Sequence, residues 1–336
     1  MDPVTQAVLG AAVAQAVVGE RLGRKAWWLG ALGGMAPDLD VLIRSASDPL
    51  VALEYHRHFT HSLAFIPVGG LLVALPFLAL ARERPREHKR LIVAATTLGW
   101  ATHGLLDAFT SYGTLLWWPF SRARVSWDWI SVIDPIYTLI LALGVAIAAK
   151  TIKRKPASIA LIVSSLYLGL CGYQHERALA AQAKIAELRS HTIVRGSAQP
   201  LLFTNLLWRS IYESEDGHIH VDALGLPWWA KIDHHGGGAR PKATAPADPV
   251  SQRGKDLALF SWFADGWIYR APELEAPDSN LEVYCGARYS YDPGRFDAVF
   301  CVELGPDGAT RLLQRRPDDP ALVLREMIAM LRTPGE

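Results

Sequence analysis

Long uncharged apolar runs constrain this 336-residue chain more than any other feature of its sequence. Four runs of 17 to 20 residues, with at most two ionisable groups each, lie at 63–80, 91–109, 130–149 and 157–173. A helix crosses the hydrocarbon core of a bilayer with roughly 20 apolar residues. The sequence therefore predicts an α-helical multi-pass membrane bundle with about four full spans. Two shorter runs, 3–19 and 26–36, predict additional short N-terminal helices.

Basic residues cluster in three connections between these runs. "RLGRK" (21–25), "ARERPREHKR" (81–90) and "KTIKRKP" (150–156) hold the densest groups of Lys and Arg. The positive-inside rule assigns such connections to the cytoplasm. We therefore predict a membrane protein whose residues 174–336 lie on the outer, extracytoplasmic side, which is the periplasm in a Gram-negative cell.

Residues 174–336 differ in character from the membrane-embedded part, 1–173. Short alternating stretches such as "HIHVDAL" (218–224) and "FDAVFCVEL" (296–304) are typical of strands, and "DPALVLREMIAMLR" (319–332) predicts a closing helix. This region is expected to form a soluble α+β domain. Its two cysteines, Cys285 and Cys301, could form a disulfide in an oxidising compartment or remain free buried thiols.

Histidine and aspartate gather at the predicted outer ends of the apolar runs. They stand in "PDLD" (37–40), "HRHFTHS" (56–62) and "HGLLD" (103–107), and one more aspartate lies near the start of the run 130–149. The seven candidate residues are Asp38, Asp40, His56, His61, His103, Asp107 and Asp134. Ionisable groups inside a membrane bundle are costly and usually mark function.

Imidazole and carboxylate ligands together suit a divalent metal, Zn foremost, with Mn, Fe or Mg as alternatives. His103 and Asp107 are four residues apart and share one helix face. The number of candidates leaves room for one ion or two. Each motif alone also fits a structural role, as a helix-end turn, an interfacial polar cap or a hydrogen-bonded pair.

The same motifs carry a resemblance to a known family. "MDPVTQAVLGAAV", "GALGGMAPDLDVL", "HRHFTHSL", "THGLLDAFTSYGTLLWWPF" and "VIDPIYTL" resemble the YdjM-like family of inner-membrane metal-dependent hydrolases, over roughly residues 1–150. The resemblance implies a phospholipase-like activity. The chain departs from many relatives at Gln6, where they have His, and at His58, where they have Gly. A ligand is therefore missing or replaced at Gln6, and His58 is not essential.

From these observations the sequence predicts a metal-dependent hydrolase of the outer leaflet that attacks an ester or phosphoester of a lipid-like substrate with metal-activated water. The predicted metal ligands are Asp38, His56, His61, His103 and Asp107. Asp40 or Asp134 is expected to take the proton. Arg57, Arg122 and Arg124 could hold a phosphate or simply anchor the chain at the interface.

Membrane lipid is the expected partner, and a formal net charge of +1 gives no reason to expect nucleic acid. Two alternatives remain: a metal transporter or sensor, and a scaffold whose structural metal supports the outer domain. Transport sites usually lie near the midplane of the bilayer, whereas these candidates lie toward one face.

Overall fold

A computed structural model describes residues 1–228, 230–244, 248, 250–276, 280–306, 308–317 and 319–332. The chain divides into two compact units. One comprises Met1–Ile43 and Tyr55–Tyr173, and the other comprises Arg44–Glu54 and Gln174–Glu336. The predicted domain boundary at residue 173 remains a prediction.

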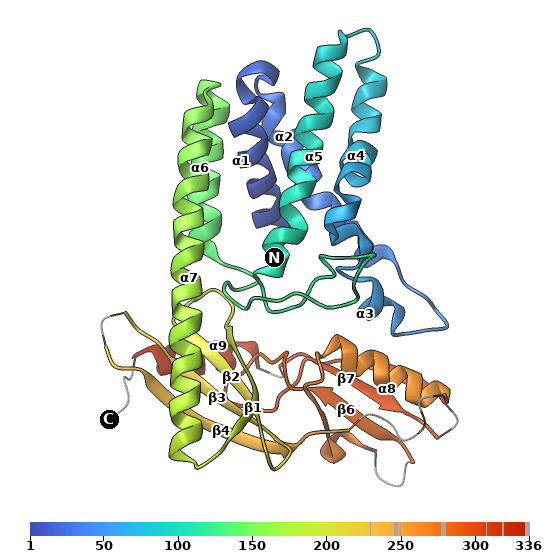
Figure 1. Cartoon of the computed structure of the whole chain (residues 1–336), viewed down its shortest axis with the longest axis vertical. Coiled ribbons are helices and arrows are strands. Elements are labelled where there is room, and N and C mark those ends of the chain that lie inside the picture. The colour runs from blue at the N-terminus through green and yellow to red at the C-terminus, as the bar shows by residue number, and fades with distance from the viewer. Residues whose placement is uncertain are drawn as a thin grey trace. The chain divides into compact units, whose positions relative to one another are not determined.

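The N-terminal unit is helical. Its helices are α1 (Pro3–Leu22), α2 (Lys25–Met35), α4 (Ile66–Leu80), α5 (Arg86–Ala108) and α6 (Pro135–Thr151), with the 3-10 turns η1 (Ala36–Leu42), η2 (Phe59–His61) and η3 (Leu63–Phe65) between α2 and α4. The short helix α3 (Val51–Tyr55) follows η1 along the chain, and four of its five residues belong to the second unit. Figure 1 shows the five longer helices side by side, with α1 packed on α2, α5 and α6. The long helix α7 (Arg154–Leu188) is continuous and contributes residues to both units.

The expectation of about four full spans is wrong. Among the described residues, two helices are long and apolar enough to cross a membrane, Leu63–Leu80 and Arg154–Leu188. The helix α6 is apolar but has only 17 residues. The helix α5 has 23 residues, but it begins with a charged turn, and His103 and Asp107 are buried near its end. Its polar groups serve the interior of the bundle, which the apolar-run argument did not take into account.

The second unit is a sheet-rich region. It contains two four-stranded antiparallel sheets with consecutive strand order. The first sheet comprises β1 (Ile193–Pro200), β2 (Leu207–Ser214), β3 (His218–Gly225) and β4 (Asp233–Pro241), and the second comprises β5 (Ile268–Arg270), β6 (Glu282–Gly286), β7 (Phe300–Leu304) and β8 (Thr310–Gln314). The helices α8 (Gln252–Phe263) and α9 (Pro320–Arg332) and the turn η4 (Pro272–Leu274) complete the unit.

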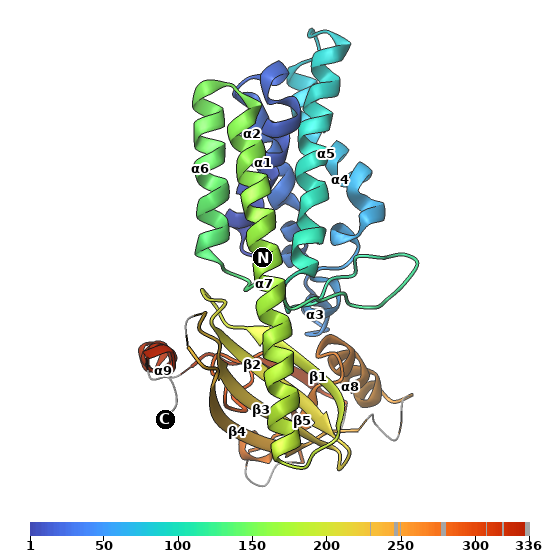
Figure 2. The same ribbon diagram turned by 60° about the vertical axis from the view of Figure 1, so that its left-hand side comes forward.

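The C-terminal half of α7 covers the first sheet (Figure 2). Ala178, Ala181 and Ile185 of the helix pack in one apolar cluster with Trp208 and Leu224 of the strands. Small side chains on the helix allow it to lie close to the sheet and to bury the larger strand side chains. This apolar contact joins α7 to the sheet within the second unit.

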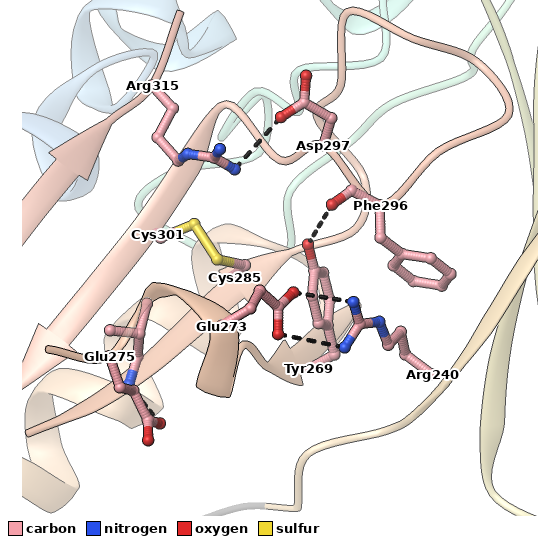
Figure 3. The surroundings of a disulfide bond; sticks show 10 residues. Arg240, Tyr269, Glu273, Glu275, Cys285, Phe296, Asp297, Cys301 and Arg315 are labelled. Atoms are coloured by element: carbon pink, nitrogen blue, oxygen red, sulfur yellow. Dashed lines mark hydrogen bonds and ion pairs between the residues drawn. A yellow bond between two sulfur atoms is a disulfide. The ribbon is translucent and has the colours of Figure 1, made fainter. Parts of the chain in front are cut away.

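Cys285 and Cys301, which the sequence left as a disulfide or two free thiols, form a disulfide. They are directly paired residues of β6 and β7. Figure 3 shows the bond with Tyr269 nearby, whose hydroxyl donates to the Phe296 carbonyl at 3.0 Å. The third cysteine, Cys171, is free and buried.

We predict that the unreduced, denatured protein exposes one alkylatable thiol and that reduction exposes three. Replacing both paired cysteines with serine should lower the free energy of unfolding by about 3 kcal/mol, since the bond closes a loop of 16 residues. Mass spectrometry after alkylation tests the first expectation, and urea unfolding of the full chain in micelles tests the second. Three thiols without reduction would contradict the bond.

Candidate metal centre

Four ionisable side chains from three segments converge inside the helical unit. Asp38 comes from η1, His61 from η2, and His103 and Asp107 from the last turns of α5. One donor atom of each lies within 4.8 Å of the others. Among the described residues, this is the group of His, Cys, Asp and Glu that could hold a metal ion.

The distances between the donor atoms match those around a small cation. The two Nε2 atoms of His61 and His103 are 2.9 Å apart. Asp38 Oδ1 lies 3.5 Å and 3.2 Å from them, and Asp107 Oδ2 lies 3.2 Å and 3.4 Å from them. A tetrahedral ion with bonds of about 2.0–2.1 Å separates its ligands by about 3.3 Å. The distances from each imidazole Nε2 to the other donors, 2.9–3.5 Å, are therefore close to the spacing around a tetrahedral metal.

Both imidazoles direct Nε2 at this point and use Nδ1 for other partners. His103 Nδ1 donates to the carbonyl of Gly34, and His61 Nδ1 lies 3.2 Å from Asp40 Oδ2 and 3.0 Å from Thr60 Oγ1. With the proton held at Nδ1, each Nε2 presents a lone pair. Carbonyl and carboxylate partners of this kind orient metal-binding histidines in known sites.

The charges around the group also favour a cation. Burial alone would lower the pKa of His61, but hydrogen bonds to Asp107, Asp38 and Asp40 raise that pKa to about 10. The fixed cation beside these three carboxylates is Arg57, whose Nε lies 3.3 Å from Asp107 Oδ2. Negative charge is therefore in excess, and a positive charge among the donors is strongly favoured.

Arg57 is a component of the site that the sequence did not assign with certainty. It adopts a left-handed backbone conformation, with φ of 60°, and its side chain is 5% exposed. Its Nε lies 3.3 Å from Asp107 Oδ2, NH1 donates to Thr110 Oγ1 at 2.9 Å, and the guanidinium stacks on Tyr112. Such burial excludes simple anchoring at the interface. The arginine instead fixes the orientation of the Asp107 carboxylate.

Asp40 lies behind the group rather than in it. Its Oδ1 accepts from His56 Nδ1 at 2.9 Å, and its Oδ2 accepts from the Arg57 backbone N–H at 2.8 Å and from Thr60 Oγ1 at 3.1 Å. Burial alone would raise the pKa of Asp40, but hydrogen bonds with His56 and His61 lower it below its usual range. Asp40 therefore orients both histidines.

The other predicted site residues lie at differing distances from the four donors. His56 is 23% exposed, and its ring makes an edge contact with His61. Asp134 caps α6 by accepting from the Tyr137 N–H, and it also accepts from the hydroxyl of Tyr167. The structure brings His56 to the edge of the site, and its role as a metal ligand remains a prediction. It does not bring Asp134 into the group, and the proton-accepting role of Asp134 also remains a prediction.

Gln6 occupies the position at which the family resemblance suggested a missing ligand. Its Nε2 donates to Asp107 Oδ1 at 3.0 Å and to the His103 carbonyl at 3.2 Å. Its Oε1 is buried without a hydrogen-bond partner among the described residues. Gln6 thus holds the second oxygen of Asp107 and leaves Oδ2 for the cluster. The N-terminal sequence motif could have identified Gln6 as a site residue, but it could not have shown that Gln6 contacts Asp107.

Comparison with known proteins identifies the family of the N-terminal half of the chain. A family model described as YdjM inner membrane protein matches residues 1–178. The chain belongs to the YdjM family. All four donors lie inside the matched residues, and the membrane assignment follows from the family together with the two apolar helices.

One curated relative in this comparison is the uncharacterized protein YfhP of Bacillus subtilis (strain 168), which is 28% identical over 141 residues. The alignment covers 42% of this chain, and the chain spans only 40% of that relative's length. No solved structure matches. The family and the donor geometry therefore carry the argument about the site.

We predict that the purified protein binds a divalent metal near one ion per chain, and that His61→Ala and Asp107→Ala abolish this binding. Asp40→Asn should weaken the affinity about 10–100-fold, because orienting partners of ligands have effects of that size. Mass spectrometry of metal content in detergent-purified protein is the measurement.

His88→Ala is the matched control, because His88 lies in the first turn of α5, about 22 Å along the helix from His103. It should leave metal content unchanged. A folded wild-type protein that holds no metal even after reloading would contradict the metal site.

Proposed function

We propose that this YdjM-family protein is a membrane-bound metal-dependent hydrolase that cleaves an ester or phosphoester of a lipid-like substrate at the outer leaflet. The observation that carries the proposal is the four-donor group with one accessible edge. The side chains of His61, His103 and Asp107 are fully buried, whereas Asp38 is 19% exposed. Because four protein donors would already complete a tetrahedron, an attacking water would need a fifth coordination position, and the exposed Asp38 edge is where it could enter.

The surroundings of that edge support a lipid substrate. Leu39 and Leu42, which flank Asp38 and Asp40 on η1, are 63% and 74% exposed. His61 lies two residues before the candidate span Leu63–Leu80. Acyl chains could contact these leucines while the polar head group meets Asp38.

The residues of the site have separable roles in such a reaction. A bound divalent metal would supply Lewis-acid activation of water and of the scissile group. In this proposal His56, which contacts Asp40 through Nδ1 and is partly exposed, would transfer a proton instead of serving as the metal ligand that the sequence predicted. Arg57 keeps Asp107 ionised and aimed at the donors.

We predict that His56→Ala lowers kcat for phospholipid hydrolysis by about 10²-fold or more while metal content is retained, because loss of acid–base assistance has effects of that size. His103→Ala and chelation should abolish turnover. The assay is product release from a phospholipid panel by the protein in nanodiscs, read by mass spectrometry with His88→Ala as the control.

The two alternatives give different results in the same preparation. A metal that is bound but supports no hydrolysis, and whose removal lowers the melting temperature, would indicate a structural site. Metal flux into sealed liposomes would indicate a transporter. Either result would overturn the hydrolase proposal.

The orientation is also proposed. Basic segments 81–90 and 150–156 flank the two candidate spans, and the positive-inside rule assigns both to the cytoplasm. The helix α7 then leads outward, and residues 174–336 are periplasmic. The disulfide between Cys285 and Cys301 is consistent with an oxidising compartment.

We predict that a phosphatase reporter active only outside the cytoplasm is active when fused after residue 336 and inactive when inserted in the segment 81–90. Both fusions should be present in comparable amounts, as judged by blotting. An inactive C-terminal fusion would place the sheet-rich unit in the cytoplasm and contradict the orientation.

A further inference from the structure

A groove lies between α4 and α5, near the loop that joins them. It has a volume of about 610 Å³. Its lining combines apolar side chains with a cationic rim and consists of Leu78, Arg82, Lys89, Arg90, Val93, Ala94 and Thr97. Figure 1 shows the two helices side by side and the connection between them. The volume is in the range of sites that bind small molecules.

The groove follows from how the two helices pack. They approach closely at Gly70, where an added Cβ would lie 2.3 Å from Thr97 Oγ1, and where Thr96 Oγ1 donates to the Gly70 carbonyl at 2.8 Å. Nearer the connecting loop, Leu78 of α4 and Val93 and Ala94 of α5 line the groove. These three side chains form an apolar furrow.

Positive charge is concentrated at one end of this furrow. The segment 81–90 contains five Lys or Arg residues and two glutamates, a net charge of +3. Of the glutamates, Glu87 pairs with Arg21, which is outside the groove, and Glu83 lies 3.5 Å from Arg82 in an exposed contact. Lys89 Nζ donates to the Arg82 carbonyl at 2.6 Å, which holds the lysine at the rim. An anion at this rim would therefore meet excess positive charge.

The groove also adjoins the bilayer. Leu78 belongs to the candidate span Leu63–Leu80, of whose residues only 17% are buried, so this helix has lipid-facing surface. Basic pockets beside membrane helices characteristically bind the head groups of anionic lipids. The positive rim of the groove and its position beside the candidate span together favour an anionic lipid as the occupant.

We propose that the groove binds one anionic phospholipid, with its phosphate at Arg82, Lys89 and Arg90 and an acyl chain along Leu78, Val93 and Ala94. This site is separate from the metal group. Arg90 and Asp107 are 17 residues apart on α5, which corresponds to about 26 Å along the helix. The groove is thus a second lipid site, independent of the proposed substrate.

The test is a lipid titration of the full chain in detergent, followed by native mass spectrometry. The probes are phosphatidylglycerol and phosphatidylethanolamine with identical acyl chains. The chain should bind one molecule of phosphatidylglycerol in preference to phosphatidylethanolamine. Arg82→Gln combined with Arg90→Gln should weaken its apparent affinity at least about tenfold, since each basic residue near an anionic lipid contributes about fivefold.

The matched control is Arg84→Gln combined with Arg86→Gln, which removes the same charge from the same segment outside the groove lining. It should change the affinity less than about twofold. Ala94→Phe, which fills the furrow and keeps every cation, should also weaken binding, and His103→Ala should leave it intact. Melting temperatures of all variants verify folding.

Three results would overturn the proposal. Equal losses in both double variants would show diffuse attraction to the basic segment. Equal binding of the two lipids would remove the role of the cations. Displacement of the lipid by millimolar inorganic phosphate would show an anion site without acyl-chain recognition.

Discussion

The donor group depends on helix backbones that approach one another without intervening side chains. An added Cβ at Gly99 would lie 2.1 Å from the Gly30 carbonyl, and one at Gly104 would lie 1.9 Å from the His61 carbonyl. These contacts bring α5 against α2 and against the turn that carries His61. Because Gly34 is also close, its carbonyl can hold His103 Nδ1. Backbone packing therefore fixes the direction of the imidazoles before any metal is bound.

The second requirement is electrostatic. Three buried or nearly buried carboxylates in one small volume would repel one another strongly, and isolated buried charges cost several kcal/mol each. Arg57 offsets part of this cost, and its left-handed backbone allows its N–H to bond Asp40 while its side chain bonds Thr110. A residue in a sparsely populated conformation persists only where surrounding contacts stabilise it. The left-handed conformation of Arg57 is thus stabilised by the same contacts that place its positive charge beside the carboxylates.

Much of the site could be predicted from the sequence. The spacing of His103 and Asp107 placed them on one helix face, and their Nε2 and Oδ2 atoms are indeed 3.4 Å apart. The motifs containing Asp38 and His61 indicated the other two donors. These histidines and aspartates could be recognised without knowledge of the tertiary structure, because ionisable residues are rare within and beside apolar runs.

The remaining features required tertiary contacts. Nothing local in "HRHFTHS" shows that Arg57 turns inward or that His56 bonds Asp40. The number of spans was overestimated because apolar runs also form helices that pack inside a bundle, as α5 does with its buried polar face. In the second unit, alternating residues indicated strands, but the two separate sheets depend on long-range pairing.

The accessible edge of the donor group connects its geometry to its substrate class. If the site faced water, Leu39 and Leu42 would each expose apolar surface beside it. Each Å² of apolar surface left in water forgoes about 25 cal/mol of stabilising free energy. At a membrane surface the same side chains are favourable, because lipid replaces water around them. An edge that combines a carboxylate donor with such leucines suits a molecule that is polar at one end and apolar at the other. That chemistry, rather than the metal alone, directs the proposal toward lipids.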